Sequence, residues 1–312
     1  MAEVELHQNV RVGLALSGGG GRGLAQVGVL KVLQRESIPV DLIAGSSVGA
    51  IIGGLYACWP DAGELEKRIF AFVKSKYMEG LNLATIRRLG GVSTLREGHG
   101  EPRSTGLFKD IQDSIRHLYA SHLALSRLSV LSGDRVMRTL QVAFEGRTFD
   151  DTEIPFAAVA VDLAAGCEVI VTNGPLARGV AASAAIPGIF PPVEIDGRML
   201  IDGGYTSPVP IAAVQTMGAN VVIAVDVSLG GLPLTDLENG VEVAMRASEV
   251  SLIALEHEQL RRADVVIPAR GQDRHWSDFS EPEESVAAGE SAATNLLDNI
   301  RAAIDERARL FV

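Results

Sequence analysis

The chain has 312 residues, of which 47% are hydrophobic and 21% are charged, a composition that suits a globular protein with a large apolar core. Its formal net charge of −11 argues against a general nucleic-acid-binding protein. The acidic N-terminus and the lack of a long uncharged apolar run predict neither a signal peptide nor a transmembrane helix. The two cysteines, Cys58 and Cys167, offer no disulfide framework, so we expect a cytoplasmic protein.

The first sixty residues predict two units of strand, turn and helix. Val10–Ser17 is expected to form a buried strand that runs into the glycine-rich stretch Gly18–Gly23, and Leu24–Gln34 has helical periodicity. Val40–Gly45 and Val48–Ala57 repeat the pattern as a short strand and a buried helix. This alternation is typical of a mostly parallel α/β sheet.

Residues 60–135 interrupt the pattern, and we interpret them as a cap-like insertion with a loop at Gly90–Thr105 and a helix at Leu107–Tyr119. Between Lys67 and Arg138 the chain has 13 Lys and Arg but 6 Asp and Glu, a local net charge of +7. This segment either contacts an anionic membrane surface peripherally or pairs with acidic residues of the main body. The candidates for membrane contact are Arg87, Arg88, Arg96 and Arg103.

The strand pattern resumes after the insertion. Pro155–Asp162 and Glu168–Thr172 predict strands, and Leu176–Ala185 predicts a helix that ends before a proline. Val193–Ile195 and Met199–Ile201 predict a hairpin, because the Asp-Gly pair between them suits a type I′ turn. The remaining expected elements are a strand at Val221–Val227, a helix at Val241–Leu260, a strand at Asp264–Pro268, an exposed acidic loop at Gly271–Glu284 and a closing helix at Ser285–Arg309.

The chain shows no internal repeat and no linker that would divide it. We therefore expect a single domain over residues 1–312. Its core should span about residues 10–230, with the insertion at about 60–135 and a C-terminal helical extension at about 235–312.

Residues 45–49, with the sequence GSSVG, match the G-x-S-x-G motif between an expected strand and an expected helix. A sharp turn there would lift the Ser47 hydroxyl out of the sheet at the positive end of the helix, and Gly45 and Gly49 would leave room for the turn. The motif alone is weak, since a glycine-rich turn that packs a helix on a sheet has the same sequence. Its position between strand and helix favours Ser47 as a nucleophile.

Residues 18–23, with the sequence GGGGRG, also follow a strand and precede a helix. They fit the dinucleotide-binding motif G-x-G-x-x-G, but Asp41 precedes the second strand, whereas that motif needs an acidic residue after it. An oxyanion hole is the favoured alternative, because glycine lets backbone N–H groups approach a reacting carbonyl oxygen closely. The residues assigned to it are Gly18, Gly19, Gly20 and Gly21, supported by Arg22 and Gly23. Arg22 either orients the loop, holds a phosphate or forms a structural ion pair.

The base that would activate the serine is either a histidine or an aspartate. The chain order of an α/β-hydrolase triad would select His257 or His275, but neither lies at a strand end or beside glycines, so both are expected to be solvated. Asp202 follows an expected strand and precedes Gly203 and Gly204, which places a carboxylate on permissive backbone. A carboxylate can take the hydroxyl proton directly if it lies within hydrogen-bond reach.

Three stretches resemble, in this order, the signature blocks of the patatin-like phospholipases: Gly18–Gly23, Gly45–Gly49 and Asp202–Gly204. Residues 14–30 and 182–193 are also similar to characteristic stretches of that family. The resemblance implies a three-layer α/β/α fold with a mostly parallel central sheet. One departure is Ser207, a position where many relatives have Asn.

The same resemblance implies a Ser-Asp dyad with Ser47 as nucleophile and Asp202 as base, working without a cofactor. The implied substrates are acyl esters of lipids, cleaved in the manner of a phospholipase A, a lysophospholipase or an esterase. The alternative is a lipid- or acyl-binding regulatory protein on the same fold with little turnover. No spacing of His, Cys, Asp and Glu in the sequence resembles a metal site.

Overall fold

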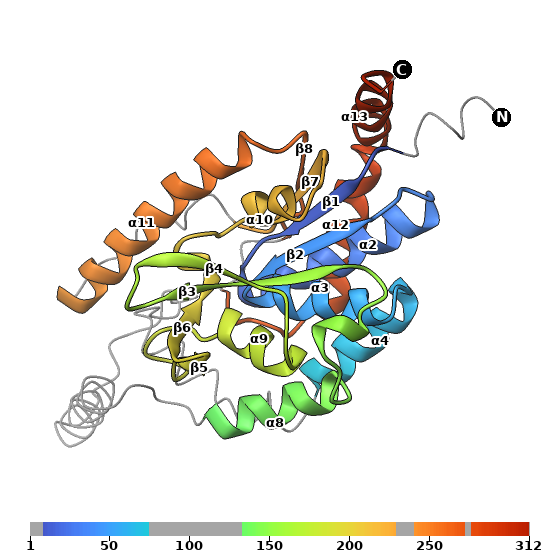
Figure 1. Cartoon of the computed structure of the whole chain (residues 1–312). Helices are drawn as coiled ribbons and strands as arrows, with labels where there is room; N and C mark the ends of the chain where they lie inside the picture. The colour runs from blue at the N-terminus through green and yellow to red at the C-terminus, as the bar shows by residue number, and fades with distance from the viewer. Residues whose placement is uncertain (1–8, 75–132, 229–239, 272–275, 312) are drawn as a thin grey trace, which may run out of the picture.

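The structure, a computed structural model, describes residues 9–74, 133–228, 240–271 and 276–311 (Figure 1). The expected loop at Gly90–Thr105 and the expected helix at Leu107–Tyr119 lie outside these ranges. The same is true of His275 and of the four arginines considered for membrane contact, Arg87, Arg88, Arg96 and Arg103.

An eight-stranded mixed sheet lies at the centre of the fold. Its parallel part has the spatial order β3 (Phe156–Asp162), β2 (Leu42–Ser46), β1 (Val12–Leu16), β7 (Val221–Asp226) and β8 (Val265–Pro268). The antiparallel part consists of β4 (Cys167–Val171), β5 (Val193–Ile195) and β6 (Arg198–Asp202). The carboxyl ends of β1, β2 and β7 meet at one edge of the sheet, which is where open α/β sheets bind ligands.

Helices pack on both faces of the sheet and complete three layers (Figure 1). The larger apolar cluster lies under α2 (Ala25–Arg35), α3 (Val48–Cys58), α4 (Ala62–Val73), α8 (Gly133–Ala143), α9 (Leu176–Ser183), α12 (Pro282–Thr294) and α13 (Leu297–Arg309). The smaller cluster lies under α10 (Ile211–Thr216) and the end of α11 (Gly240–Leu260). Short 3₁₀ helices are η1 (Gly20–Leu24), η2 (Phe149–Asp151) and η3 (Gly203–Tyr205).

The side chains of β1 explain why the two faces differ. Leu14 and Leu16 point into the larger cluster, whereas Gly13 and Ala15 face α10. A Cβ atom on Gly13 would lie only 2.5 Å from the Cβ atom of Ala219. Small residues at alternate positions of the strand therefore let the α10 layer approach the sheet closely.

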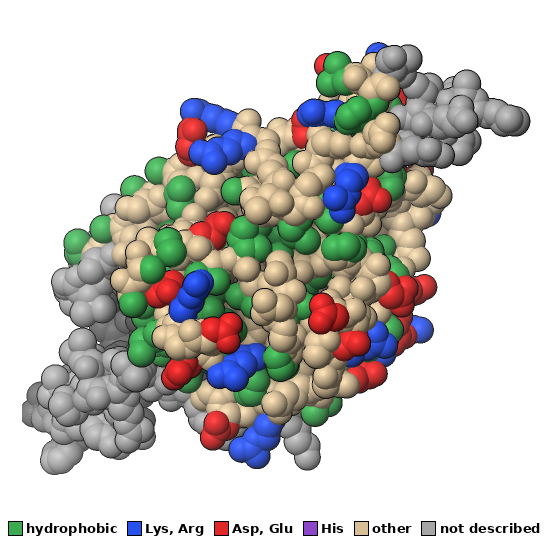
Figure 2. Space-filling model, in the orientation of Figure 1, with side chains coloured by type: hydrophobic (Ala, Val, Ile, Leu, Met, Phe, Trp, Pro, Cys, Tyr) green, Lys and Arg blue, Asp and Glu red, His purple; other side chains and the backbone are tan. Residues whose placement is uncertain are grey.

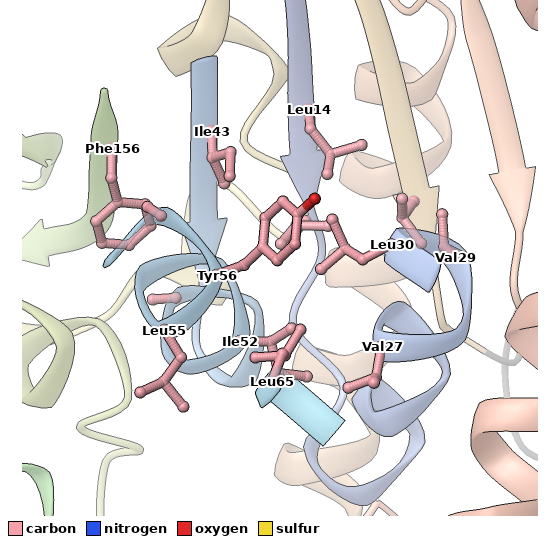
Figure 3. Packing of buried hydrophobic residues seen from close by; sticks show 14 of the residues in the cluster. Leu14, Val27, Val29, Leu30, Ile43, Ile52, Leu55, Tyr56, Leu65 and Phe156 are labelled. Carbon is pink, nitrogen blue, oxygen red and sulfur yellow. The ribbon is translucent and has the colours of Figure 1, made fainter. Parts of the chain in front are cut away.

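The packing of α3 fixes the site that lies at its N-terminus. In Figure 3, Ile52 and Tyr56 of α3 and Leu30 of α2 gather beneath Leu14 and Ile43 of the sheet. Ile52, Leu30, Leu14 and Ile43 are fully buried. Truncation of such a side chain to alanine typically costs about 2–5 kcal/mol, so this cluster holds α3 firmly against the strands.

Most of the sequence-predicted elements are confirmed. In both strand–turn–helix units of the first sixty residues, each strand and each helix begins and ends within two residues of its expected position. The hairpin of β5 and β6 is also present, with Asp196 at φ 51° and Gly197 at φ 75°, the positive values that a type I′ turn requires. Among the helices in the described ranges, none has the length and apolar character needed to span a lipid bilayer.

The expected closing helix at Ser285–Arg309 is wrong, because two helices occupy this region. The first, α12, packs on α2 at backbone contact distance: a Cβ atom on Gly28 would meet the Val286 carbonyl, and one on Gly289 would meet the Ala25 carbonyl. The second, α13, contacts β7 and β8 instead. The helical pattern is interrupted at residues 295–296, between the end of α12 and the start of α13.

Candidate active site

Ser47 occupies a sharp turn between the end of β2 and the start of α3. Its backbone has φ 54° and ψ −122°, a conformation that is strained for any residue with a side chain. Glycine on both sides of the turn lets α3 approach the strands closely. A Cβ atom on Gly45 would meet the backbone of Gly49, and one on Gly49 would meet the Leu16 carbonyl. The Ser47 N–H donates to the Ser183 hydroxyl oxygen at 3.1 Å, which ties the turn to α9.

Asp202 is brought to this turn by the register of the sheet. Ser46 of β2 pairs with Val159 of β3, and the next residue of β3, Ala160, pairs with Asp202 at the end of β6. The Asp202 N–H donates to the Ala185 carbonyl at 3.0 Å. The expected nucleophile and the expected base, from opposite halves of the chain, thus lie at the ends of β2 and β6, the two strands that flank β3.

The glycines after Asp202 hold its carboxyl in place. The Gly204 N–H donates to Asp202 Oδ1 at 2.8 Å. A Cβ atom on Gly203 would meet the Val159 carbonyl and would lie 2.9 Å from Ser46 Oγ, so only glycine lets the turn lie against β3. The carboxyl therefore has a fixed direction rather than free rotation.

The Asp202 carboxyl is buried, with the residue only 4% exposed. Burial raises its pKa to about 6, while hydrogen bonds from the Ser47 hydroxyl and the Gly204 N–H favour the charged form and limit the rise. At neutral pH the carboxyl is therefore mostly ionised, yet it is a stronger base than a solvated aspartate. A carboxylate of this kind can accept the proton of the serine hydroxyl that contacts it.

The glycine-rich loop passes directly beside Ser47. A Cβ atom on Gly18 would lie 3.3 Å from the Ser47 Cβ atom. Two of the four expected oxyanion-hole N–H groups are engaged elsewhere: Gly18 donates to the Pro208 carbonyl at 3.0 Å, and Gly21 donates to the Trp276 carbonyl at 2.6 Å. Within the described part of the chain, the N–H groups of Gly19 and Gly20 have no protein acceptor. Of the four expected donors, Gly19 and Gly20 are therefore the two whose N–H groups the described residues leave available.

The expectation that Gly271–Glu284 forms an exposed loop is confirmed only in part: of its described residues, 276–281 form a loop in which Ser280 and Glu281 are exposed. Ser277 is buried, and Pro282 already begins α12. The backbone of this segment lies against the glycine-rich loop, because a Cβ atom on Gly20 would meet the Trp276 carbonyl and one on Gly21 would meet the Asp278 carbonyl. Close packing with a distant segment thus explains two of the consecutive glycines.

Arg22 orients the glycine-rich loop. Its Nε donates to the Gly19 carbonyl at 3.3 Å. Burial of the guanidinium lowers its pKa, and the nearby carboxyls of Glu256, Glu249 and Asp226 oppose this effect. Of the three roles considered for Arg22, loop orientation is the one that a direct contact supports.

Several neighbours of the site could not be recognised from the sequence. Ser183 and Ala185 contact Ser47 and Asp202 through single hydrogen bonds; they lie in the stretch 182–193 that resembles the family, but nothing in that stretch indicates which of its residues reach the site. The candidate His257 is exposed on α11. Across the residues that the structure describes, no group of three or more His, Cys, Asp and Glu side chains is arranged to hold a metal ion.

Comparisons with known proteins indicate the family of the chain. The family model described as "Patatin-like phospholipase" matches residues 14–214. The chain is 33% identical over 230 residues to "Patatin-like phospholipase domain-containing protein 7" of Rattus norvegicus, a match that covers 73% of this chain and 14% of the rat protein. It is 33% identical over 218 residues to an "Uncharacterized NTE family protein" of Mycobacterium bovis, covering 70% of this chain and 49% of that one.

This chain therefore matches less than half of the length of either relative. Among solved structures, the crystal structure of VipD from Legionella pneumophila has a TM-score of 0.48 and 14% sequence identity. That alignment covers 96% of this chain and 67% of VipD.

Proposed function

This chain belongs to the patatin-like phospholipase family, and we propose on that basis that it hydrolyses acyl esters of lipids with Ser47 as nucleophile and Asp202 as base. The observation that carries the proposal is the contact between the Ser47 hydroxyl, on a strained turn at a helix N-terminus, and a buried carboxyl whose pKa is raised to about 6. Family membership supports a lipid acyl hydrolase in general. The assignment of the two residues rests on their geometry.

In the first step, Ser47 Oγ attacks the ester carbonyl carbon while Asp202 accepts the hydroxyl proton. The carbonyl π electrons move to the oxygen, and the N–H groups of Gly19 and Gly20 stabilise the resulting oxyanion. Such a donor is worth about 3–4 kcal/mol of transition-state stabilisation in comparable hydrolases. When the tetrahedral intermediate collapses, the ester C–O bond breaks, and the departing alcohol takes the proton from Asp202. An acyl group remains on Ser47.

In the second step, a water molecule attacks the acyl carbonyl and gives its proton to Asp202. The same two N–H groups stabilise the second oxyanion. Collapse breaks the bond to Ser47 Oγ, which recovers the proton, and the free fatty acid departs. The raised pKa of Asp202 suits both steps, because a base is most effective when its pKa lies near the working pH.

We further propose that the basic segment 67–138 brings the enzyme to anionic membrane surfaces. The proposal rests on the net charge of this segment, because its most basic portion lies outside the described residues and two of its described basic residues, Lys67 and Arg68, pair with acidic side chains. Arg68 pairs with Glu64 at 2.9 Å and with Glu145 at 2.8 Å, and Lys67 approaches Glu64 at 3.8 Å. On the face shown in Figure 2, basic and acidic side chains of the described residues are interspersed. Salt-sensitive binding of the full chain to anionic vesicles would support this proposal.

Hydrolysis of a panel of phospholipids and lysophospholipids in vesicles, followed by mass spectrometry of the released fatty acids, tests the proposed function. The wild type should release fatty acids, and Ser47→Ala should reduce the rate by about 10³-fold or more. If the wild type binds vesicles but releases no fatty acid from any member of the panel, the chain is a lipid-binding protein and not a hydrolase.

A further inference from the structure

The end of β7 supports the glycine-rich loop from behind. The Ser17 N–H donates to the Val225 carbonyl at 3.2 Å, and the Val227 N–H donates to Ser17 Oγ at 3.1 Å. A Cβ atom on Gly19 would lie 2.6 Å from Val227 Cγ2, so the loop and the strand end are in close contact. A shift in the position of the end of β7 would therefore also shift the glycine-rich loop that lies beside Ser47.

The residue between these two contacts, Asp226, is fully buried and paired. Its Oδ1 accepts the Ser228 N–H at 2.8 Å, and its Oδ2 accepts Arg270 Nη2 at 2.7 Å. Its carboxyl also shares a hydrogen bond with the Glu256 carboxyl of α11. Burial raises the pKa of Asp226, but the hydrogen bonds from Glu256 and Arg270 outweigh burial and hold that pKa below its usual range.

Glu256 carries the proton of this carboxyl pair. It is 6% exposed, and its Oε1 atom is buried without a hydrogen-bond partner among the described residues. A buried oxygen without a donor disfavours a carboxylate, and two carboxyls in contact cannot both ionise cheaply. Burial and the neighbouring Asp226 raise the pKa of Glu256 to about 8. At neutral pH, Glu256 is therefore a neutral acid that donates a proton to its hydrogen bond with Asp226.

Arg22 connects this pair to the candidate oxyanion hole. Its Nε donates to the Gly19 carbonyl at 3.3 Å. The carboxyls of Glu256, Glu249 and Asp226 act on its guanidinium through space, by their charge and without a direct hydrogen bond. Because a peptide unit is planar and trans, its carbonyl and its N–H point in opposite directions. A fixed Gly19 carbonyl therefore fixes the direction of the Gly20 N–H, which belongs to the same peptide unit.

We propose that the buried carboxyl pair of Asp226 and Glu256 positions the Gly19–Gly20 peptide for catalysis, through the end of β7 that packs against Gly19 and through the charge that it presents to Arg22. This inference rests on the proposed acyl hydrolase function. The charged groups that face one another here come from four elements: Arg22 from η1, Asp226 from β7, Glu249 and Glu256 from α11, and Arg270 from the segment after β8. Glu249 is itself paired with Arg246 of α11 at 2.7 Å.

The arrangement predicts a loss of activity at alkaline pH. As the pH rises through about 8, Glu256 ionises, stops donating to Asp226 and becomes a second negative charge in the cluster. The new charge attracts Arg22 away from the Gly19 carbonyl, so the Gly20 N–H loses its alignment. Since Asp202 must be ionised, kcat should rise through about pH 6 and fall through about pH 8.

The test is the pH profile of kcat and KM on a water-soluble short-chain p-nitrophenyl ester, normalised to sites labelled by a fluorophosphonate. Glu256→Gln should keep its neutral-pH kcat within about twofold and lose the alkaline fall, because the amide donates but does not titrate. Asp226→Asn should lower kcat by about 10-fold with little change in KM. Glu258→Gln, on the same helix but with a 58% exposed side chain, should behave like the wild type.

An alkaline fall in Glu256→Gln identical to that of the wild type overturns the inference, whether or not Asp226→Asn folds. In that case the wild type still hydrolyses the ester and is labelled at Ser47, so the proposed function stands. A wild type that neither hydrolyses esters nor is labelled removes the proposed function, and this inference with it.

Discussion

Replacement of Asp202 by asparagine should remove activity and at the same time stabilise the fold. The carboxyl is buried and its pKa is raised to about 6, so the folded state disfavours the charge that catalysis needs. Asparagine has the same shape and its side-chain oxygen can still accept the Gly204 N–H, but it bears no charge. The amide cannot accept the Ser47 proton, and therefore kcat should fall by about 10³-fold or more.

The size of the stabilisation follows from proton linkage. The folded-state pKa of about 6 exceeds the ordinary value of 3.8 by about 2 units, and each unit corresponds to about 1.4 kcal/mol. Below about pH 4, Asp202 is protonated in both the folded and the unfolded state, so the charge costs nothing. As the pH rises through about 6, the wild type loses up to about 3 kcal/mol that the asparagine variant keeps.

The assay is thermal or urea denaturation of both proteins at pH 7.5 and at the lowest pH where both stay folded. At pH 7.5 the variant should be more stable by about 1–3 kcal/mol, or about 5 °C in Tm, and the difference should shrink toward acid pH. Asp162→Asn serves as a matched control at the end of β3, where the carboxylate accepts the N–H groups of Ala164 and Ala165. This control should gain no stability. An Asp202→Asn variant that is less stable than the wild type at pH 7.5 would refute the reasoning.

Three further substitutions test the geometry. Ser47→Gly should raise the free energy of unfolding by about 1 kcal/mol because it relieves the strained φ of 54°, whereas equal stability of Ser47→Gly and Ser47→Ala would argue against strain. Gly20→Ala should lower kcat by about 10-fold or more, since its Cβ atom would meet the Trp276 carbonyl, while Gly146→Ala, with positive φ but open space, should keep its activity. His257→Ala should remain active in the ester assay, because the side chain is exposed on α11.

Local sequence patterns were sufficient for most strands and helices. The hydrophobic runs at β1 and β2 and the glycines around Ser47 predict the local backbone conformation, because that conformation depends mainly on residues nearby in the sequence. The Asp-Gly turn of the hairpin is likewise local, and so Asp202 could be placed at a strand end. These are the features from which the Ser-Asp arrangement could be expected.

Long-range packing could not be read from the sequence. The contact of Trp276 and Asp278 with the glycine-rich loop joins segments more than 250 residues apart in the sequence. Neither segment has a periodic pattern that predicts this contact. From the sequence, four N–H groups were expected to line the oxyanion hole, but those of Gly18 and Gly21 already donate hydrogen bonds to backbone carbonyls. In the same way, the Glu-His-Glu run of α11 gave no sign that Glu256 is buried against Asp226.

The central claim is that Ser47 is an activated nucleophile that depends on Asp202. Its most direct test is the rate of covalent labelling by a fluorophosphonate, followed by intact-protein and peptide mass spectrometry of the wild type, Ser47→Ala and Asp202→Asn. We expect one label per wild-type chain, located on Ser47, with no label on Ser47→Ala and labelling of Asp202→Asn slowed by about 100-fold or more. Rapid labelling of Asp202→Asn, or a wild-type label on any residue other than Ser47, would contradict the claim.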